Sequence, residues 1–283
     1  MRLLPTLAVL SAVLAAPAHA AGSYDSCTAF ITSLPAYIAT QGTYCFNKDL
    51  STPQASGEVI LVDANNVTID CNGFKLGGLS AGPETQAVGI ATLGRLNTTI
   101  RDCNIRGFDV GIRASGGGGH TIEDNRVEGS QSRGISIENS GGVLRRNRVL
   151  DSAIGDHSGF IVGVHVSGSV DVIDNTIDGV APSGPSAADA IGLHVDDNPD
   201  GAIDGTRIRG IAPTPGRQAF GIYTASVARL TIRGNQIVGT GLVGSYGIYC
   251  GNDLASAAQN QVAGFETGIA QCHGLTNNWV NPN

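Results

Sequence analysis

The sequence predicts an all-β fold, a single-stranded parallel β-helix in which one chain winds into stacked coils. A Gly-aliphatic pair returns eight times at intervals of 21 to 29 residues, which is about one coil of a β-solenoid. A second motif, aliphatic-x-x-Asn-x-aliphatic, alternates with the first, and 40 of the 283 residues are glycine, as frequent turns require. The pairs are Gly89-Ile90, Gly111-Ile112, Gly134-Ile135, Gly163-Val164, Gly192-Leu193, Gly221-Ile222, Gly247-Ile248 and Gly268-Ile269.

The two motifs predict two short strands in each coil, paired with the same strands above and below. Alternate residues of a strand point inward, so the aliphatic residues are expected to stack into continuous columns. Asparagines at the bend can pass amide hydrogen bonds from coil to coil, and the repeated glycine suits a tight or positive-φ corner. The asparagines are Asn72, Asn125, Asn147, Asn175, Asn235 and Asn260, with Cys103 and Thr206 at the same position of two other coils.

The first residues predict export. Residues 1–20 carry Arg2, an apolar stretch and the small-residue sequence Ala18-His19-Ala20, which together read as a cleaved signal peptide. The apolar stretch is too short for a stable transmembrane helix, and no later segment predicts a membrane span. We therefore expect the mature chain outside the cytoplasm, in the periplasm or the medium.

Residues 21–43 are predicted to cap the open end of the solenoid, which then occupies residues 44–283. Pro35 and the apolar residues Phe30, Ile31 and Ile38 favour a short helix over the exposed sheet edge. The first strands are expected at residues 44–46 and 59–62. The tail is short, and Trp279 is expected to lie over the last coil.

All six cysteines lie after the predicted signal, which in an oxidising compartment favours disulfides. Cys27 and Cys45 bracket the cap, whereas the other four occupy similar points of neighbouring coils. Coils about 4.8 Å apart bring Cα atoms within the roughly 4.4–6.8 Å that a disulfide spans. We expect the pairs Cys27–Cys45, Cys71–Cys103 and Cys250–Cys272; buried free thiols are the alternative.

Charge and composition limit the classes of molecule that the chain is expected to bind. The net charge is −7, aromatic residues make up 5% of the chain, and no basic patch is present. This excludes the phosphate-neutralising, base-stacking surface of a nucleic-acid-binding protein. The repeat fills nearly all of the chain, so we expect one elongated domain and a monomer.

The chain resembles the right-handed parallel β-helix proteins of the pectin-lyase-like superfamily. The Asn and Gly-aliphatic motifs over residues 44–275 carry this resemblance, which implies the hand of the coil. The N-terminal part also resembles a group of secreted bacterial β-helix proteins, through Cys27, Leu34-Pro35, Gly42-x-Tyr44-Cys45, Asp49-Leu50 and residues 67–72. The second resemblance implies a fold and a compartment, but no reaction.

Insertions gather on one edge of the predicted solenoid. The spacing from each repeated glycine to the next Asn position is 12 to 14 residues, but the spacing from there to the next glycine varies from 8 to 17. The long spacings fall largely in three consecutive coils, through residues 150–162, 178–191 and 209–220. Loops lengthened on one face of a solenoid often form a binding wall, although surface loops also tolerate neutral insertion.

The strand beside that wall predicts the functional face. Its outward positions, two and four residues after each repeated glycine, place His165, His194 and Tyr223 in one row and Ser167 and Asp196 in the next. Histidine and tyrosine exchange protons, aromatic rings pack against sugar rings, and carboxylates act as acids, bases or calcium ligands. Glu138 and Asp196 are two coils apart, which places their backbones about 10 Å apart if coils rise about 4.8 Å each. This distance is near the upper end of the roughly 6.5–9.5 Å between the two carboxyl groups of inverting glycosidases.

We therefore expect the face to bind an extended, acidic or cell-envelope polysaccharide. The predicted catalytic residues, for lyase or hydrolase chemistry, are His165, His194 and Asp196, and the predicted substrate contacts are Glu138, Ser167, Tyr223, Tyr249 and Arg217. The ordered signatures of polygalacturonase-like enzymes are not reproduced, so a surface or matrix module without turnover is the competing interpretation. A periplasmic metal-handling β-helix is a third interpretation, but the scarcity of Met and the absence of clustered histidines argue against it. No metal ligands are predicted, and calcium is the one cofactor left open.

Overall fold

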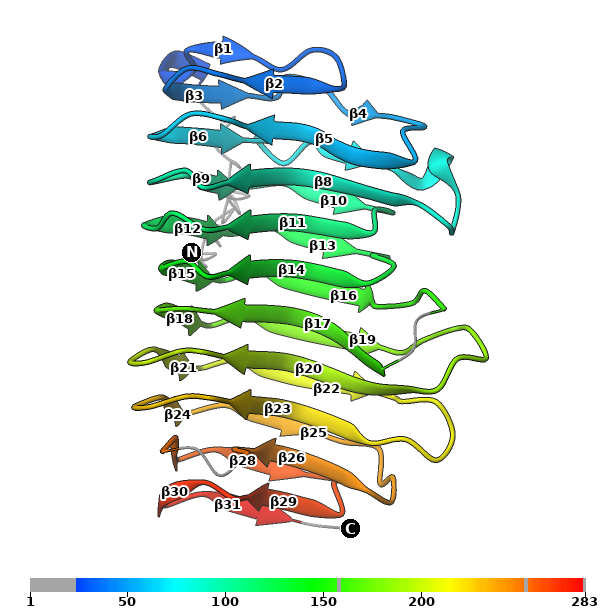
Figure 1. The fold of residues 1–283 in the computed structure, drawn as a ribbon, viewed down its shortest axis with the longest axis vertical. Coiled ribbons are helices and arrows are strands. Elements are labelled where there is room, and N and C mark those ends of the chain that lie inside the picture. Colours follow the sequence, from blue (N-terminus) through cyan, green and yellow to red (C-terminus); the bar gives the residue numbers. More distant parts are fainter. Residues whose placement is uncertain (1–23, 157–158, 252–253, 282–283) are drawn as a thin grey trace, which may run out of the picture.

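The computed structural model describes residues 24–156, 159–251 and 254–281. They form one parallel β-solenoid with three sheets along its length, and the chain advances from one end of the stack to the other (Figure 1). The predicted signal peptide, residues 1–20, lies outside the described residues. Each full coil contributes one strand to each of three sheets, here called sheets A, C and B in chain order. The predicted solenoid is thus confirmed, with three strands in a coil instead of two.

Sheet A contains the strand that precedes the Asn turn. Its strands are β1 (Ala29–Phe30), β3 (Gly42–Cys45), β6 (Val67–Asp70), β9 (Thr99–Arg101), β12 (His120–Glu123), β15 (Gly142–Arg145), β18 (Val170–Ile173), β21 (Ala202–Asp204), β24 (Thr231–Arg233), β27 (Ser256–Ala258) and β30 (His273–Thr276). Its inward aliphatic residues pair in register from coil to coil, for example Ile100 with Ile122 and Leu144.

Sheet C follows the Asn turn. Its strands are β4 (Leu50–Ser51), β7 (Lys75–Gly77), β10 (Asn104–Arg106), β13 (Arg126–Glu128), β16 (Arg148–Ser152), β19 (Thr176–Val180), β22 (Arg207–Ile211), β25 (Gln236–Val238), β28 (Gln261–Ala263) and β31 (Trp279–Asn281). The tail therefore adds β30 and β31 to the stack, and the Trp279 side chain is more than half exposed.

Sheet B begins after the variable loops and contains the repeated glycines. Its strands are β2 (Ala36–Ile38), β5 (Ser56–Val62), β8 (Gln86–Leu93), β11 (Val110–Ser115), β14 (Arg133–Glu138), β17 (Gly159–Ser167), β20 (Ala188–Asp196), β23 (Ala219–Ala225), β26 (Ser245–Tyr249) and β29 (Thr267–Ala270). The residue after each repeated glycine stacks inward on its equivalents, as Val164 does on Leu193. These columns form the core.

The helix predicted at the N-terminal end is wrong. Described residues contain no α-helix, only the 3-10 turns η1 (Tyr24–Ser26) and η2 (Leu79–Ala81). Residues 29–45 instead form β1, β2 and β3, because the open edge of the solenoid offers backbone partners: the Ile31 amide donates to the Cys45 carbonyl over 2.9 Å. Ile31 and Ile38 are buried in the first coil, and Pro35 lacks the amide a helix would use.

The Asn ladder is confirmed for Asn125, Asn147 and Asn175 and for Asn235 and Asn260, whereas the Asn72 side chain donates to the Phe46 carbonyl instead. The disulfides are also confirmed. The Asn147 side-chain amide donates to Asn175 Oδ1 over 3.1 Å, and the Asn147 backbone amide donates to the same oxygen over 2.9 Å. The three predicted disulfides are present, with Cα separations of 5.8 Å for Cys27–Cys45, 4.7 Å for Cys71–Cys103 and 4.9 Å for Cys250–Cys272. They tie the first coils and the last coils to their neighbours.

The eight repeated glycines serve close approach, and none of them has a positive φ. A Cβ atom on Gly192 would lie 2.6 Å from Ile208 Cγ2 and 2.7 Å from the Gly221 carbonyl oxygen. The glycine therefore faces the interior, where sheet C and the next coil leave no room for a side chain. The positive-φ corner considered from the sequence is wrong for these positions.

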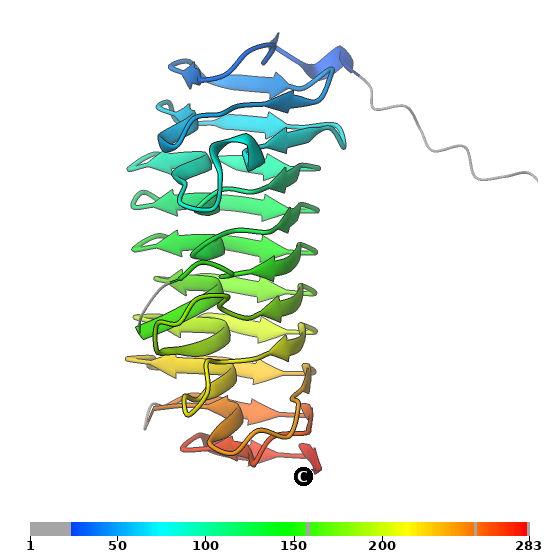
Figure 2. The ribbon, with the colours of Figure 1, turned by 90° about the vertical axis from the view of Figure 1, so that its right-hand side faces the viewer.

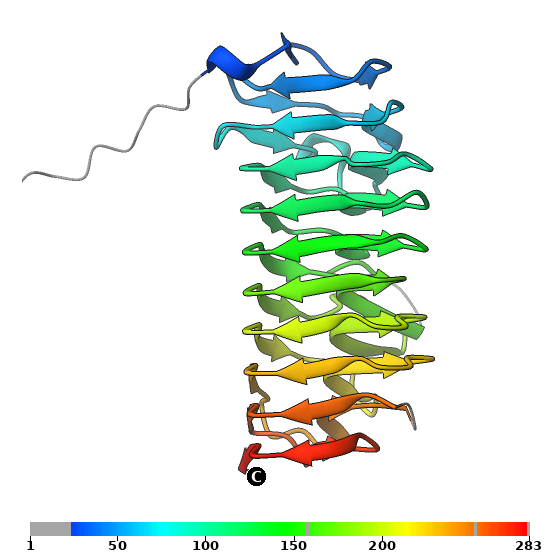
Figure 3. The same ribbon diagram turned by 90° about the vertical axis from the view of Figure 1, so that its left-hand side faces the viewer.

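The variable spacing is confirmed on one side of the solenoid. Figure 2 faces the loops between sheets C and B, whereas the opposite side, in Figure 3, repeats with a nearly constant outline. Much of the extra length forms strand: β17 and β20 have nine residues each, against six in β11 and β14. Described residues contain no helix long and apolar enough to cross a membrane.

Candidate functional site

The candidate site lies on the outer face of sheet B, where the strands are longest. Ser136, His165, His194, Tyr223 and Tyr249 stand directly beside one another on β14, β17, β20, β23 and β26. This register is the one that alternation from the repeated glycine predicts. Residues 29 or so apart in the chain thereby become neighbours across one strand spacing.

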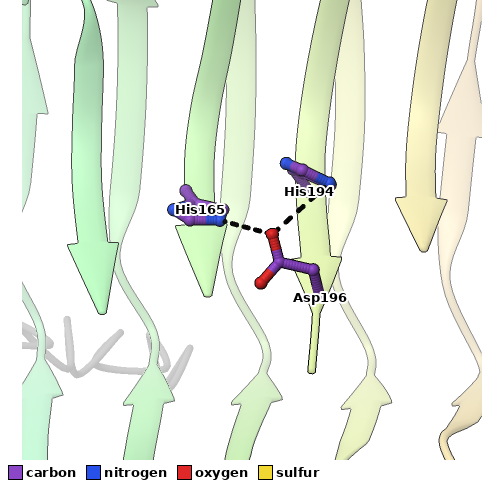
Figure 4. A group of neighbouring side chains, drawn as sticks. All are labelled: His165, His194 and Asp196. Carbon is purple, nitrogen blue, oxygen red and sulfur yellow. Dashed lines mark hydrogen bonds and ion pairs between the residues drawn. The ribbon is translucent and has the colours of Figure 1, made fainter. Parts of the chain in front are cut away.

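Three predicted catalytic residues form one group (Figure 4). His165 Nε2 lies 3.1 Å from Asp196 Oδ2, and His194 Nε2 lies 3.8 Å from the same oxygen. The two imidazole rings stack, with centroids 5.1 Å apart. The side chains of His165 and His194 are only 12% and 16% exposed, so the group is half-buried yet reachable from solvent.

Glu138 holds the other side of the His165 ring. Glu138 Oε1 lies 3.7 Å from His165 Nδ1 and accepts hydrogen bonds from the Ser136 hydroxyl over 2.7 Å and from Arg133 Nη1 over 2.6 Å. The His165 ring therefore has a carboxylate near each nitrogen, Glu138 on one side and Asp196 on the other. Arg133 is the member of this group that sequence reasoning missed, whereas alternation placed Ser136 in the outward row without giving it a role.

The environment shifts two pKa values. The His165 ring, the Ser136 hydroxyl and the Arg133 guanidinium together lower the pKa of Glu138 to about 2, against the opposing effect of burial. Burial lowers the pKa of His194 to about 4, and the neighbouring His165 acts in the same direction. At neutral pH Glu138 is therefore an anion and His194 is unprotonated.

Aromatic rings continue the row beyond the histidines. The ring centroids of His194 and Tyr223 are 5.1 Å apart, and Tyr223 stacks on Tyr249 at 5.5 Å with an angle of 2° between the planes. We call His165, His194, Tyr223 and Tyr249 the ring ladder. It runs across the strands, along the long axis of the solenoid, for about 14 Å if coils rise about 4.8 Å each.

A small apolar cluster supports the ladder from the same outer face. Val162, Ile191 and Phe220 are buried there, and Tyr223, Tyr246 and Tyr249 pack against them. Phe220 contacts three of the tyrosine rings, at centroid distances of 5.1 to 5.7 Å. Sequence reasoning missed this cluster because its members precede the repeated glycine, where the alternation of the strand is interrupted.

Phe160 was also missed. Its ring lies 6.0 Å from Tyr223 and 6.4 Å from His194 between centroids, and the residue is 55% exposed. It comes from the lengthened start of β17, so the insertion places an exposed aromatic ring beside the ladder. Residues 160–162, Phe-Ile-Val, are apolar throughout, so alternation gave no signal that Phe160 faces outward.

The remaining predicted contacts lie at the edges of the face. Arg217 pairs with Asp189 at 2.9 Å, and Asp189, near the start of β20, is buried. Ser167 is buried, and its hydroxyl oxygen accepts a hydrogen bond from the Asn139 backbone amide over 2.8 Å. Both residues therefore hold local structure in the described geometry.

The group combines proton-exchanging and ligand-binding capacity. Asp196 orients His165, and unprotonated His194 can bind a metal ion through its Nε2 atom. His165 and His194, although separate in the sequence, are clustered with Asp196 in space, and their ligand atoms lie within 4.8 Å of one another. Beside this group, the tyrosines and Phe160 offer flat apolar surface.

Comparisons with known proteins agree on the fold. Tailspike protein 2 of the Escherichia coli O157:H7 bacteriophage CAB120 matches with a TM-score of 0.59 and 15% identity, over 84% of this chain but 35% of its own length. The A-modules of the Azotobacter vinelandii mannuronan C-5 epimerases AlgE4 and AlgE6 match with TM-scores of 0.54 and 0.52, each at 12% identity. The match to the AlgE4 module covers 86% of this chain and 80% of that module. The match to the AlgE6 module covers 87% of this chain and 88% of that module.

Sequence comparison points the same way at the level of the family. No curated protein sequence matches this chain significantly. The family model for the right-handed β-helix region matches residues 88–266, well over half of the chain. The coils that carry the ring ladder all lie inside this range. The chain therefore belongs to the right-handed β-helix family.

Proposed function

We propose that the outer face of sheet B binds an extended polysaccharide. The observation that carries this proposal is the ring ladder, an uninterrupted row of four ring side chains on neighbouring coils. The flat apolar faces of such rings suit the CH faces of sugars, and the polar groups at their margins suit hydroxyl groups. Because the row follows the solenoid axis, the polymer would lie across the strands.

The margins of the ladder fit this partner. Arg133, Glu138 and Asp196 flank the histidine end, so hydrogen-bond donors and acceptors lie beside the rings. The lengthened strands and loops between sheets C and B border the face on one side.

Two of the similar folds are modules of epimerases whose names specify mannuronan, a polysaccharide, as substrate. Three disulfides support a location outside the cytoplasm.

The protonation of the group favours binding without turnover. A general base works best when its pKa lies near the working pH, and the pKa of about 4 makes His194 a weak base at neutral pH. Glu138, with a pKa of about 2, is not a proton donor there. The proton-transfer role predicted for His194 is therefore the less favoured form of this proposal, and binding without turnover is the favoured one.

Affinity electrophoresis on a panel of neutral and uronate polysaccharides tests the binding site. We expect Tyr223→Ala to weaken binding of the best polymer about tenfold, or roughly 1.4 kcal/mol, because it opens a gap in the middle of the ladder. Trp279→Ala is the matched control, since it removes another exposed aromatic ring far from the ladder, on β31. Equal weakening by both variants, or none by Tyr223→Ala, contradicts the assignment.

The same polymers separate binding from cleavage. Incubation with the protein, with and without calcium, is followed by reducing ends and by the absorbance of unsaturated products. We expect neither to rise above the level that His194→Ala produces. Chain ends that the native protein releases and His194→Ala does not would instead establish a lyase or hydrolase at this site.

A further inference from the structure

We propose that His165, His194 and Asp196 form a binding site for a divalent transition metal of the zinc class. Their ligand atoms come from two adjacent strands, β17 and β20, and converge on the outer face of sheet B (Figure 4). The inference goes beyond glycan binding and does not depend on it.

The distances suit one metal ion shared by three ligands. Zinc binds histidine nitrogen at about 2.0–2.1 Å and carboxylate oxygen at about 2.0–2.2 Å, so two ligands on a tetrahedral ion are about 3.4 Å apart. Asp196 Oδ2 is 3.1 Å from His165 Nε2 and 3.8 Å from His194 Nε2, values on either side of that separation. Small rotations of the side chains would bring all three into coordination.

The kind of ligand selects the class of metal. Two imidazoles and one carboxylate are ligands that zinc, nickel and copper accept, whereas calcium prefers six to eight oxygen atoms. Among described residues these three are the one group of histidine, cysteine and acidic side chains whose ligand atoms meet in this way. A site of three protein ligands leaves a fourth position to water or to a bound molecule.

Glu138 supplies the outer contact that metal-binding histidines usually have. A ligating histidine commonly directs its other ring nitrogen to a carboxylate, which fixes the ring orientation. His165 Nδ1 lies 3.7 Å from Glu138 Oε1 and 3.4 Å from Ser136 Oγ, while its Nε2 atom points at Asp196. Arg133 in turn holds Glu138 in place, over 2.6 Å.

The ligand side chains can be reached from solvent. The side chains of His165 and His194 remain 12% and 16% exposed, and that of Asp196 is 30% exposed. An ion can therefore reach the three ligand atoms without a change in the backbone.

Calorimetric titration of chelator-treated, untagged protein with zinc chloride tests the proposal. We expect one zinc ion per chain, with affinity at least tenfold weaker in His194→Asn and in Asp196→Asn. His273→Asn is the matched control, because His273 is an exposed histidine on β30 of sheet A, and its loss should leave zinc affinity unchanged. Thermal unfolding of each variant without metal verifies that it is folded.

A second measurement does not depend on the variants. The native protein titrated with cobalt should develop the strong visible absorption of a four-coordinate ion, and calcium at the same concentration should not suppress it. The proposal is overturned if zinc does not bind, if it binds as tightly to both site variants as to the native protein, or if calcium binds at least as tightly as zinc.

Discussion

Burial gives His194 a pH-dependent role in stability. Its pKa is about 4 in the folded protein, whereas an exposed histidine titrates near 6.5. Between these values the unfolded chain binds a proton and the folded chain does not. The free energy of unfolding should therefore fall as the pH drops from about 6.5 to about 4, by roughly 1–3 kcal/mol from this residue.

Urea unfolding at a series of pH values measures this contribution. In His194→Gln the loss of stability between pH 6.5 and pH 4 should be smaller than in the native protein, because the variant has no group to protonate at that position. His273→Gln, at an exposed site, should follow the native curve. Parallel curves for the native protein and His194→Gln would show that burial does not govern this residue.

At the residue scale, inward-outward alternation correctly predicts the row of side chains two residues after each repeated glycine. It fails at the residue directly before that glycine. The side chains two after each glycine, His165, His194 and Tyr223, lie side by side as expected. Phe220 was missed because the glycine itself turns inward, so that the preceding residue points outward, which strict alternation does not anticipate. The Glu138–Asp196 pair, considered as acid and base, instead flanks the His165 ring.

At the scale of elements, the repeated glycine allows sheets B and C to pack closely against each other. In Gly192→Ala, a methyl group would meet Ile208 Cγ2 and the Gly221 carbonyl oxygen at 2.6 and 2.7 Å, both fixed by strands. Overpacking of this kind costs about 1–3 kcal/mol. Gly118→Ala is the matched control, since the nearest atom to its new Cβ is 3.9 Å away.

Chemical denaturation of the two alanine variants tests this explanation. Gly192→Ala should shift the unfolding midpoint to lower denaturant, while Gly118→Ala should leave it nearly unchanged. A similar midpoint for both would mean that the repeated glycine has a role other than making space.

The elements also show where sequence reasoning meets a tertiary effect. The Asn ladder and cysteine pairs follow from local spacing, because identical positions of adjacent coils become neighbours. The N-terminal segment has apolar residues at helical spacing, yet it forms strands β1 and β2, because the first coil leaves backbone groups that only a strand can pair. An effect of this kind depends on the partner strand and is not visible in the segment itself.

At the scale of the whole molecule, the fold brings residues that are far apart in the sequence together on one continuous surface. The outward residues of strands β14, β17, β20, β23 and β26 form one face along the solenoid axis. Charged groups lie at one end of this face and stacked tyrosines at the other. The chain as a whole carries a net charge of −7, so its overall charge does not favour an acidic polymer. The face therefore recognises its polysaccharide by shape and by stacking of sugar rings on its side-chain rings.

The outer face of sheet C is the natural competitor for an acidic polymer. Arg126, Arg148 and Arg207 project there from β13, β16 and β22 along the same axis, and the described structure gives Arg148 and Arg207 no carboxylate partner. A direct view of the bound polymer decides between the two faces.

The most direct test is a crystal structure of the protein with an oligosaccharide from the polymer that binds best. Our account predicts sugar rings stacked on His194, Tyr223 and Tyr249, with the chain running along the solenoid axis. Sugar density over Arg148 and Arg207 on sheet C, with the ring ladder left in contact with solvent, would contradict it.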